Sequence, residues 1–365
     1  MKTLLIDSIL LVLKKLSYYK LTKDVNLSVD TLGSETLLSE LILGLNNSLL
    51  RNENYSFYLF GDQIKIKKEL QNYKSLIKKV EIVNCDEAVL MSDKPADVVK
   101  QRNQSSMFQA IESVVKGTSD AVLSCGNTGA LMALSILNIK TIKEIKRPAI
   151  ASIWPNLKSE SIILDLGANT KNDPRYLLDN AILGSSLASI LFKIKKPSVG
   201  LLNVGVEENK GNDIIQSASE TLTKMSESSA INYYGYVEGN DISIGKTNVV
   251  VTDGFTGNVA LKTAEGTAKM IQSYLEMGFK SSIVSKLGYL LSSLALKSMS
   301  ERLDPRIHNC GILIGLNSPV IKCHGSSENL GITYAADIVH SLIENSVNEK
   351  IKEYISNILR NQYIS

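Results

Sequence analysis

Four short clusters rich in Gly, Asn and Ser each follow an apolar, strand-like run of the sequence. They occupy residues 124–129 (SCGNTG), 165–169 (DLGAN), 253–258 (DGFTGN) and 324–327 (HGSS). Glycine lets the backbone approach a ligand closely, and N–H groups at the start of a helix attract negative charge. In an open α/β sheet the carboxyl ends of the strands face one crevice, so the clusters are expected to meet there. The pattern therefore predicts a pocket that binds an anion.

The first cluster lies between a strand-like run (121–123) and a helical pattern (130–134). This order places exposed N–H groups beside the side chains of Asn127 and Thr128, an arrangement suited to phosphate. A capped helix start, which any α/β protein contains, explains the same residues equally well.

The last cluster is preceded by a basic residue. Because Lys322 and His324 are two apart in an extended segment, their side chains are expected to point to the same side. There His324 could polarise a carbonyl group or hold phosphate; a purely structural histidine is the alternative.

The elements that must position these clusters follow from the hydrophobic pattern. Strands are predicted near 26–30, 55–60, 79–84, 120–124, 148–153, 161–165, 198–203, 231–235 and 248–252, with a further pair near 311–322. Helices are predicted over 36–50, 62–75, 105–116, 128–140, 175–194, 211–226, 257–278 and 328–362. This alternation indicates a three-layer α/β/α sandwich with a mainly parallel sheet. Since no linker or repeat divides the chain, one domain over 26–345 is expected, followed by a C-terminal helix end over 346–365.

The composition excludes several classes of protein. With 365 residues, 44% of them hydrophobic, the chain can bury a large core. A formal charge of only +3 argues against nucleic acid as a partner. The four cysteines stand alone, so we expect buried thiols and neither disulfides nor a metal site. The glycine-rich fingerprints of dinucleotide and P-loop binding are absent, which argues against a nucleotide cofactor.

Residues 1–25 form a separate N-terminal extension. Their apolar run is broken by Asp7 and followed by Lys14 and Lys15. The run is shorter than the ~20 residues that span a bilayer, and no small-residue cleavage site follows it. We expect an amphipathic extension or a translation start placed too early.

One segment, 280–300, departs from the globular pattern. It lacks acidic residues, and lysines flank an apolar stripe at helical spacing. The stripe consists of Ile283, Val284, Leu287, Leu290, Leu291 and Leu294. These features are typical of a helix that lies on anionic lipid. A helix packed on the core or on a second subunit is the alternative.

Six ordered blocks of the sequence together resemble the phosphate acyltransferase family of bacterial phospholipid synthesis, PlsX. The blocks are 124–132 (SCGNTGALM), 164–169 (LDLGAN), 199–212 (VGLLNVGVEENKGN), 237–242 (VEGNDI), 249–266 (VVVTDGFTGNVALKTAEG) and 320–327 (VIKCHGSS). The resemblance spans roughly residues 26–345, and six blocks in order are far more specific than any one of them.

The resemblance implies transfer of a fatty acyl group from acyl carrier protein to inorganic phosphate, without a cofactor. The acyl phosphate would then serve a downstream glycerol-3-phosphate acyltransferase. The resemblance also implies a fold related to phosphotransacetylases and isopropylmalate-type dehydrogenases, a homodimer, and a cytoplasmic protein attached to the inner face of the membrane. A helical protrusion over 270–303 would make the membrane or dimer contact.

The chemistry of this reaction favours donors and cations over a strong base. Phosphate, with a second pKa near 6 in esters, is already an anionic nucleophile at neutral pH. In the expected site, Lys322 offsets charge, His324 orients or protonates the leaving thiolate, and Asn258 is the third catalytic candidate. The phosphate or substrate ligands expected are Ser124, Gly126, Asn127, Thr128, Gly129, Asn169, Asp253 and Gly257. Because an ionised Asp253 would repel phosphate, it is expected to cap a helix or turn, or to act as a base through water.

Two further expectations concern docking and activity. The carrier protein of this family is acidic, so a basic docking groove is expected, with Lys100, Arg102, Lys193, Lys195 and Lys196 as candidates and a solvated face as the alternative. The 30–35 loop (DTLGSE) departs from the family's usual glycine pair, because Ser34 stands at the second glycine. If that position requires a positive φ, the loop is strained. A weakened, membrane-bound scaffold and an α/β dehydrogenase relative are therefore the alternatives.

Overall fold

The computed structural model describes residues 23–101, 104–303, 310–325 and 327–363. In this part of the chain, eleven strands form one sheet in the order β3-β2-β1-β4-β11-β10-β5-β6-β9-β7-β8. The strands are β1 Val25–Asp30, β2 Tyr55–Gly61, β3 Val80–Asn84, β4 Ala121–Ser124, β5 Ala149–Pro155, β6 Glu160–Leu164, β7 Ser198–Leu202, β8 Asn232–Val237, β9 Val249–Val251, β10 Cys310–Ile314 and β11 Val320–Cys323.

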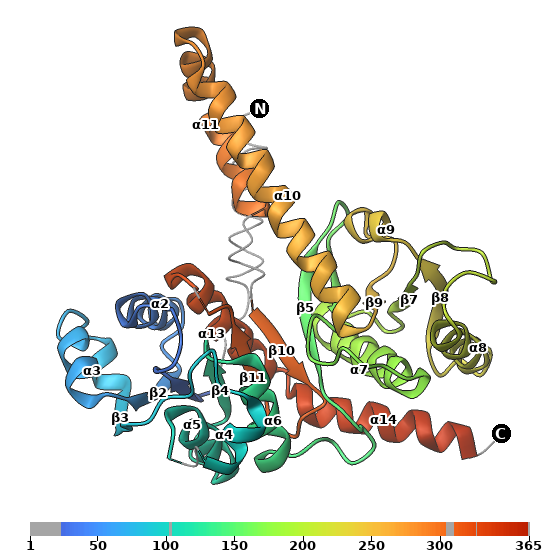
Figure 1. Cartoon of the computed structure of the whole chain (residues 1–365), viewed down its shortest axis with the longest axis horizontal. Helices are drawn as coiled ribbons and strands as arrows, with labels where there is room; N and C mark the ends of the chain where they lie inside the picture. The colour runs from blue at the N-terminus through green and yellow to red at the C-terminus, as the bar shows by residue number, and fades with distance from the viewer. Residues whose placement is uncertain (1–22, 102–103, 304–309, 326, 364–365) are drawn as a thin grey trace.

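Helices cover both faces of this sheet (Figure 1). One core is shared by α2 Leu38–Arg51, α3 Gln63–Leu70, the short helix η1 Leu76–Lys79, α7 Pro174–Phe192, α8 Asp213–Glu227, α13 Asn329–Glu344 and α14 Val347–Tyr363. The other is shared by α4 Pro95–Gln101, α5 Ser106–Val115, α6 Thr128–Asn138, α9 Gly239–Ile244 and the base of α10 Gly254–Lys280. In β9, Val249 and Val251 enter the first core and Val250 the second, the alternation of a strand buried on both faces. The three-layer α/β/α prediction is confirmed.

The sheet contains two parallel blocks of opposite direction. Strands β3, β2, β1, β4 and β11 form one block, and β6, β9, β7 and β8 form the other. Three antiparallel pairings, β11 with β10, β10 with β5 and β5 with β6, separate them. The assumption that all strand ends face one crevice is therefore wrong in its simple form. Adjacent strands rotate by roughly 20–25°, so the five steps from β4 to β9 accumulate about 100° and turn the two carboxyl edges partly toward each other.

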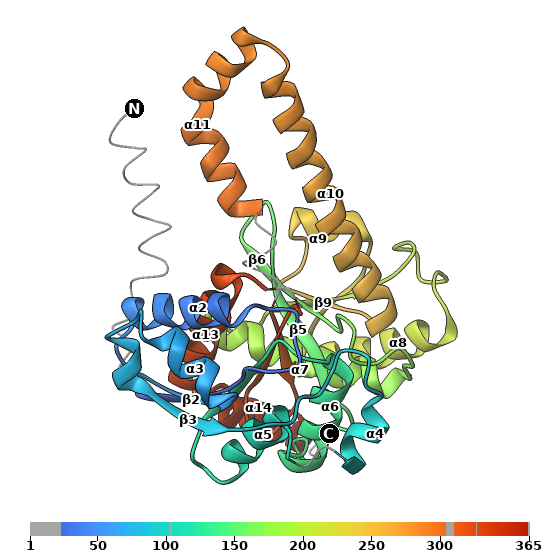
Figure 2. The same cartoon turned by 60° about the vertical axis from the view of Figure 1, so that its left-hand side comes forward.

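Two long helices project from the body of the molecule as a hairpin (Figures 1 and 2). They are α10 and α11 Ile283–Leu303. Near the tip the rings of Phe279 and Tyr289 meet edge to face, with their centroids 5.3 Å apart. The predicted protrusion, 270–303, covers the outer part of α10 and the whole of α11. No helix of the described residues is both long enough and apolar enough to cross a membrane.

The C-terminal region differs from its predicted form. A single helix over 328–362 was expected, but α13 ends at Glu344 and α14 begins at Val347. Between them, Ser346 adopts a left-handed backbone conformation with φ 50°, which a continuous helix does not allow. Four apolar side chains of α14 are buried in the first core: Val347, Ile351, Ile355 and Ile358. The final helix is thus an integral part of the domain.

All four cysteines are buried and free, as predicted. No group of His, Cys, Asp and Glu within the described residues could hold a metal ion. The N-terminal extension, up to residue 22, lies outside the described residues.

Candidate active site

Three polar residues lie side by side at the carboxyl edge of the first block. Ser124 ends β4 and is paired in register with Asp30 of β1 and with Lys322 of β11. The Ser124 hydroxyl donates to Asp30 Oδ2 at 2.7 Å and accepts from the Gly126 N–H at 3.0 Å. The Ser106 hydroxyl donates to Asp30 Oδ1 at 2.5 Å. Burial raises the pKa of the Asp30 carboxyl, although these hydrogen bonds and the nearby Lys322 oppose the shift.

Lys322 is a buried cation. Its residue is only 8% exposed, and its ammonium group donates to the carbonyl oxygens of Cys125 (3.4 Å) and Cys323. Burial lowers the pKa of this ammonium, because the charged form loses hydration. An ammonium carries three N–H donors, and these two carbonyls leave one of them for a ligand.

The side chain of Asn127 does not match its predicted role. Its amide group donates to three carbonyl oxygens, those of Leu90, Met91 and Asp93, at 2.9–3.2 Å. Its carbonyl oxygen caps α6 by accepting from the Ala130 N–H at 3.0 Å. Both ends of this amide are engaged within the protein, so the expectation of a side-chain donor for phosphate is corrected to a helix cap that also holds the 90–93 loop.

The other residues of this cluster divide between packing and binding. A Cβ on Gly129 would lie 2.7 Å from Cγ of Pro95, so glycine is needed there for close packing against α4. The donors that the start of α6 can offer to an anion are backbone N–H groups of its first turn, at Thr128 and Gly129.

In the second block, Asp165 organises the 165–169 cluster. It follows β6, is fully buried, and was not among the predicted site residues although it lies within a recognised block. Its carboxylate accepts five hydrogen bonds, at 2.7–3.1 Å, from the backbone N–H groups of Ile150, Gly167, Ala168 and Asn169 and from the Tyr176 hydroxyl. This carboxylate fixes the loop from inside.

Asn169, a predicted phosphate donor, is also engaged within the protein. Its amide group donates to the Pro148 carbonyl at 2.9 Å and to the Tyr176 hydroxyl at 2.8 Å. Both amide hydrogens are used, so the prediction is corrected: the Asn169 side chain ties its loop to the start of β5 and to α7.

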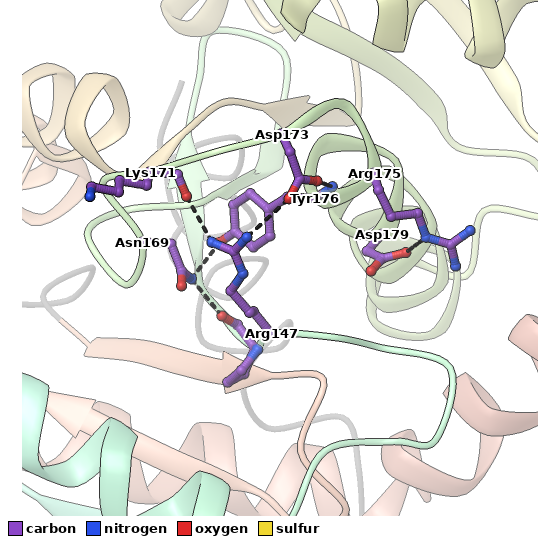
Figure 3. A network of polar contacts seen from close by, with 8 residues as sticks. Arg147, Asn169, Lys171, Asp173, Arg175, Tyr176 and Asp179 are labelled. Carbon is purple, nitrogen blue, oxygen red and sulfur yellow. Dashed lines mark hydrogen bonds and ion pairs between the residues drawn. The ribbon is translucent and has the colours of Figure 1, made fainter.

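Arg147 binds the segment that follows this loop, at Lys171 and Asp173 (Figure 3). Its guanidinium donates to the Lys171 carbonyl at 2.9 Å and to the Asp173 carboxylate at 3.0 Å, and lies 5.6 Å from the centre of the Tyr176 ring. Asp173 in turn caps α7. The network makes the 165–173 segment rigid where α10 rests on it.

Helix α10 begins on this loop. Asp253 is its N-cap, and accepts from the N–H groups of Phe255 and Thr256 at 2.9 Å and from the Thr256 hydroxyl at 2.8 Å. This confirms the expectation that its carboxylate is held by backbone donors. A Cβ on Gly257 would lie 1.9 Å from the Asp165 carbonyl oxygen. Gly257 therefore permits close packing of α10 on the 165–169 loop. Gly257 was predicted as a phosphate or substrate ligand, and this packing explains the glycine without a ligand.

The base of α10 links the two blocks. Asn258 lies beside the 165–169 loop, near Gly167. Further along the helix, Lys262 forms an ion pair with Glu265 at 2.8 Å. Burial lowers the pKa of His324, and the charges of Lys262 and Lys322 lower it further, whereas Glu265 and Glu35 oppose the shift. Lys322 and His324, at the end of β11, are therefore electrostatically coupled to the base of α10, which rests on the second block. Neither Lys262 nor Glu265 was predicted, although both lie within the 249–266 block.

The 30–35 loop closes another side of the site without the expected strain. Its one glycine, Gly33, has φ 75°, and a Cβ there would lie 2.0 Å from the Val89 carbonyl oxygen. Ser34 is not among the residues with positive φ, so the substitution at the second glycine carries no left-handed backbone strain. The Thr36 hydroxyl donates to the Gly325 carbonyl at 3.0 Å and joins this loop to the last cluster.

The predicted docking lysines do not gather at this site. Lys193, Lys195 and Lys196 precede β7, at the amino edge of the second block, whereas α10 follows the carboxyl edge of the parallel strand β9. Their position counts against a groove beside the site. Lys100 lies on α4, and Arg102 lies outside the described residues.

Comparison with known proteins finds a family model and relatives that match nearly the whole chain. A family model described as "Fatty acid synthesis protein" matches residues 25–350. The phosphate acyltransferase of Azorhizobium caulinodans is 43% identical over 332 residues, which cover 91% of this chain and 93% of the relative. The phosphate acyltransferase of Sinorhizobium medicae is 41% identical, with 90% and 94% covered.

Solved structures support the fold alone. The EutD phosphotransacetylase of Staphylococcus aureus superposes with a TM-score of 0.58 at 16% identity, covering 93% of this chain and 98% of that one. A phosphotransacetylase of Streptococcus pyogenes gives a TM-score of 0.61 at 16% identity, with 90% and 97% covered. With the family model and the close relatives in agreement over nine-tenths of its length, the chain belongs to the phosphate acyltransferase family of fatty acid and phospholipid synthesis, and it is an acyltransferase.

Proposed function

We propose that this protein transfers a fatty acyl group from acyl carrier protein to inorganic phosphate. The observation that carries the proposal is the buried ammonium of Lys322, in register with Ser124 and next to His324 at the end of β11. A buried cation of this kind is stabilised by an anionic ligand. The helix start of α6 supplies further positive potential at the same edge.

The reaction needs no side-chain nucleophile. An oxygen of hydrogen phosphate attacks the thioester carbonyl carbon, the C–S bond breaks, and the proton of hydrogen phosphate ends on the carrier's sulfur. Ser124 is an unsuitable nucleophile because it is fully buried and a bulky thioester cannot reach its hydroxyl. The Cys125 thiol is 1% exposed and is equally unsuited to attack a bulky thioester. Catalysis then rests on positioning and charge stabilisation, which supply about 7–11 and 3–4 kcal/mol respectively in favourable cases.

His324 is suited to carry the proton from phosphate to sulfur. Its lowered pKa, below the usual value near 6.5, keeps the imidazole neutral at pH 7. A neutral imidazole accepts a proton on one nitrogen and delivers it as an acid in the next step. In this proposal the protein acts as a homodimer in the cytoplasm, and its acyl phosphate is consumed by a glycerol-3-phosphate acyltransferase in the synthesis of phosphatidic acid.

A direct assay tests this function. Purified protein, given palmitoyl carrier protein and labelled phosphate, is expected to form acyl phosphate and to release the carrier thiol in equal amounts. Neither product should form when phosphate is omitted. A folded protein that releases no thiol would exclude the proposal and leave the scaffold function as the better account.

We further propose that the hairpin attaches the protein to the inner face of the membrane. The six residues of the apolar stripe on α11 are each between 58% and 88% exposed. Lys286 lies within this stripe and Lys280 precedes it, so that an apolar surface and cations occur together. A second copy of the chain is the other partner that such a surface would suit.

Flotation with liposomes of anionic phospholipid tests the attachment. The double variant Leu287→Glu, Leu291→Glu is expected to lose about tenfold or more of its partitioning, since each leucine contributes about 1.5–3 kcal/mol when buried. Leu157→Glu, at an exposed position in the loop between β5 and β6, is the matched control. Equal flotation of both variants would contradict membrane attachment. Loss of dimer with unchanged flotation would assign the stripe to the subunit interface.

A further inference from the structure

The base of α10 carries a second charged pair, Lys262 and Glu265, in the electrostatic neighbourhood of the site. Asn258, Leu261, Lys262 and Glu265 are spaced by three or four residues and so share one face of the helix. Leu261 packs against the second core, and Asn258 lies on the 165–169 loop. This face therefore borders the body of the protein, with Leu261 and Glu265 partly buried and the Lys262 side chain 46% exposed to solvent.

Glu265 is unusual on this face. Its side chain is 13% exposed, and Oε2 accepts from Lys262 at 2.8 Å. Its other oxygen, Oε1, is fully buried and has no hydrogen-bond partner among the described residues. A buried carboxylate oxygen without a donor is unfavourable by about 1–3 kcal/mol. A ligand that supplies a donor would remove this penalty.

Lys262 adds a like charge to a site that already holds a buried cation. Its charge lowers the pKa of both Lys322 and His324. Besides Glu265, two carboxylates are described near these cations: that of Asp30, beside Lys322, is engaged by two serine hydroxyls, and that of Glu35 lies near His324. Cations that face one space repel one another unless an anion lies between them.

We propose that Lys262 and Glu265 form the part of the site that selects hydrogen phosphate: Lys262 binds its charge, and Glu265 Oε1 accepts its P–OH proton. The inference rests on the proposed function, since phosphate is the acyl acceptor there. A carboxylate only accepts hydrogen bonds, hydrogen phosphate has a hydroxyl to donate, and sulfate of the same shape has none. Sites that hydrogen-bond a substrate hydroxyl reject analogues without it.

The assignment keeps the reaction balanced. An unprotonated phosphate oxygen attacks the thioester, and the P–OH proton held by Glu265 is the one that reaches sulfur. Glu265 is electrostatically coupled to His324, which lies on the route. Lys262 would touch the substrate, while Glu265 would both touch it and orient Lys262.

Two substitutions test the assignment. Glu265→Gln keeps the shape but removes the acceptor charge, so we expect the KM for phosphate to rise about tenfold and inhibition by sulfate to strengthen by a similar factor. Lys262→Met is expected to raise the KM for phosphate about tenfold or more, with the KM for the acyl carrier unchanged and Lys262→Arg closer to wild type. The matched control is the exposed Lys116–Glu112 pair at the end of α5, as Lys116→Met and Glu112→Gln.

The pH profile of the reaction rate gives a second readout, because its acid limb should shift in opposite directions in the two variants. With the other charges near His324, those of Lys322 and Glu35, left in place, removing the Lys262 charge raises the pKa of His324 and moves the limb to higher pH. Removing the Glu265 charge lowers this pKa and moves the limb to lower pH. Binding is measured separately, as stabilisation against thermal unfolding by phosphate and by sulfate.

The outcomes separate this inference from the proposed function. A wild type stabilised by phosphate more than by sulfate, with the difference lost in Glu265→Gln, supports the inference even if the carrier assay fails. If folded Glu265→Gln keeps the wild-type preference for phosphate, the selection role is overturned. If Lys262→Met keeps the wild-type KM, the ion pair only stabilises the helix.

Discussion

Replacing Lys322 by Met is expected to lower kcat for acyl transfer about 10²- to 10³-fold while leaving the protein at least as stable as the wild type. The side chain is buried, and its ammonium is held by the carbonyl oxygens of Cys125 and Cys323 at the end of β11. Met fills nearly the same volume without a charge. In the proposed mechanism the variant therefore loses a cation that stabilises charge in the transition state, but it also escapes the penalty of a buried cation.

The opposite movement of activity and stability distinguishes a catalytic lysine from a structural one. If Lys322 mainly held the structure together, Met would lower the unfolding temperature along with the rate. The measurements are kcat and KM for phosphate at saturating acyl carrier, and thermal unfolding without ligand. Lys224→Met, an exposed position on α8, is the control for loss of one positive charge. Wild-type turnover in a folded Lys322→Met would remove Lys322 from the mechanism.

The three layers of the fold and the family could be predicted from the sequence, because both depend on local patterns. Strands such as β9 are short apolar runs, and helices such as α5 show a clear apolar face between turn residues. Strand direction is different: no residue in β5 or β10 signals that it runs against its neighbours. The reversal of the second block became visible only from the pairing of strands, and it determines which clusters lie together.

The site was predicted less well, since donors and acceptors of one type serve either ligand or protein. Asn127 and Asn169 have the right chemistry for phosphate, yet carbonyl oxygens and a tyrosine hydroxyl use their amide hydrogens. The pair Lys262–Glu265 has nearly the same sequence spacing as Glu276–Lys280, which is an exposed surface pair. Only the packing of the base of α10 on the body tells the two apart.

The altered 30–35 loop also shows that residue types alone do not reveal the backbone geometry they adopt. A serine in place of a glycine suggested strain and weakened activity, because the backbone angle at that position was unknown. The positive φ falls on Gly33, which is retained, and Ser34 has no such requirement. Gly33 also leaves room for the Val89 carbonyl, so the contact that needs glycine is intact. This removes the backbone strain on which the scaffold alternative partly rested.

The largest loss of stability is expected from Asp165→Ala, by about 4 kcal/mol or more. The carboxylate is fully buried and accepts five hydrogen bonds that hold the 165–169 loop, the start of β5 and Tyr176. Alanine leaves those donors without this partner, and each of the two buried ones, the Ile150 N–H and the Tyr176 hydroxyl, becomes unfavourable by about 1–3 kcal/mol. Because the first turn of α10 rests on this loop through Gly257, the base of the hairpin should loosen with it.

Urea unfolding of Asp165→Ala against two graded controls measures this effect. Tyr176→Phe removes a single donor to the same carboxylate and should lower the free energy of unfolding by about 1 kcal/mol. Asp173→Ala removes the cap of α7, at a side chain that is 43% exposed, and should also lower it by about 1 kcal/mol. A loss in Asp165→Ala no larger than in these two would mean that the loop holds its form without the carboxylate. The expected order instead identifies Asp165 as the residue that keeps the base of α10, and with it Lys262 and Glu265, in place on the 165–169 loop.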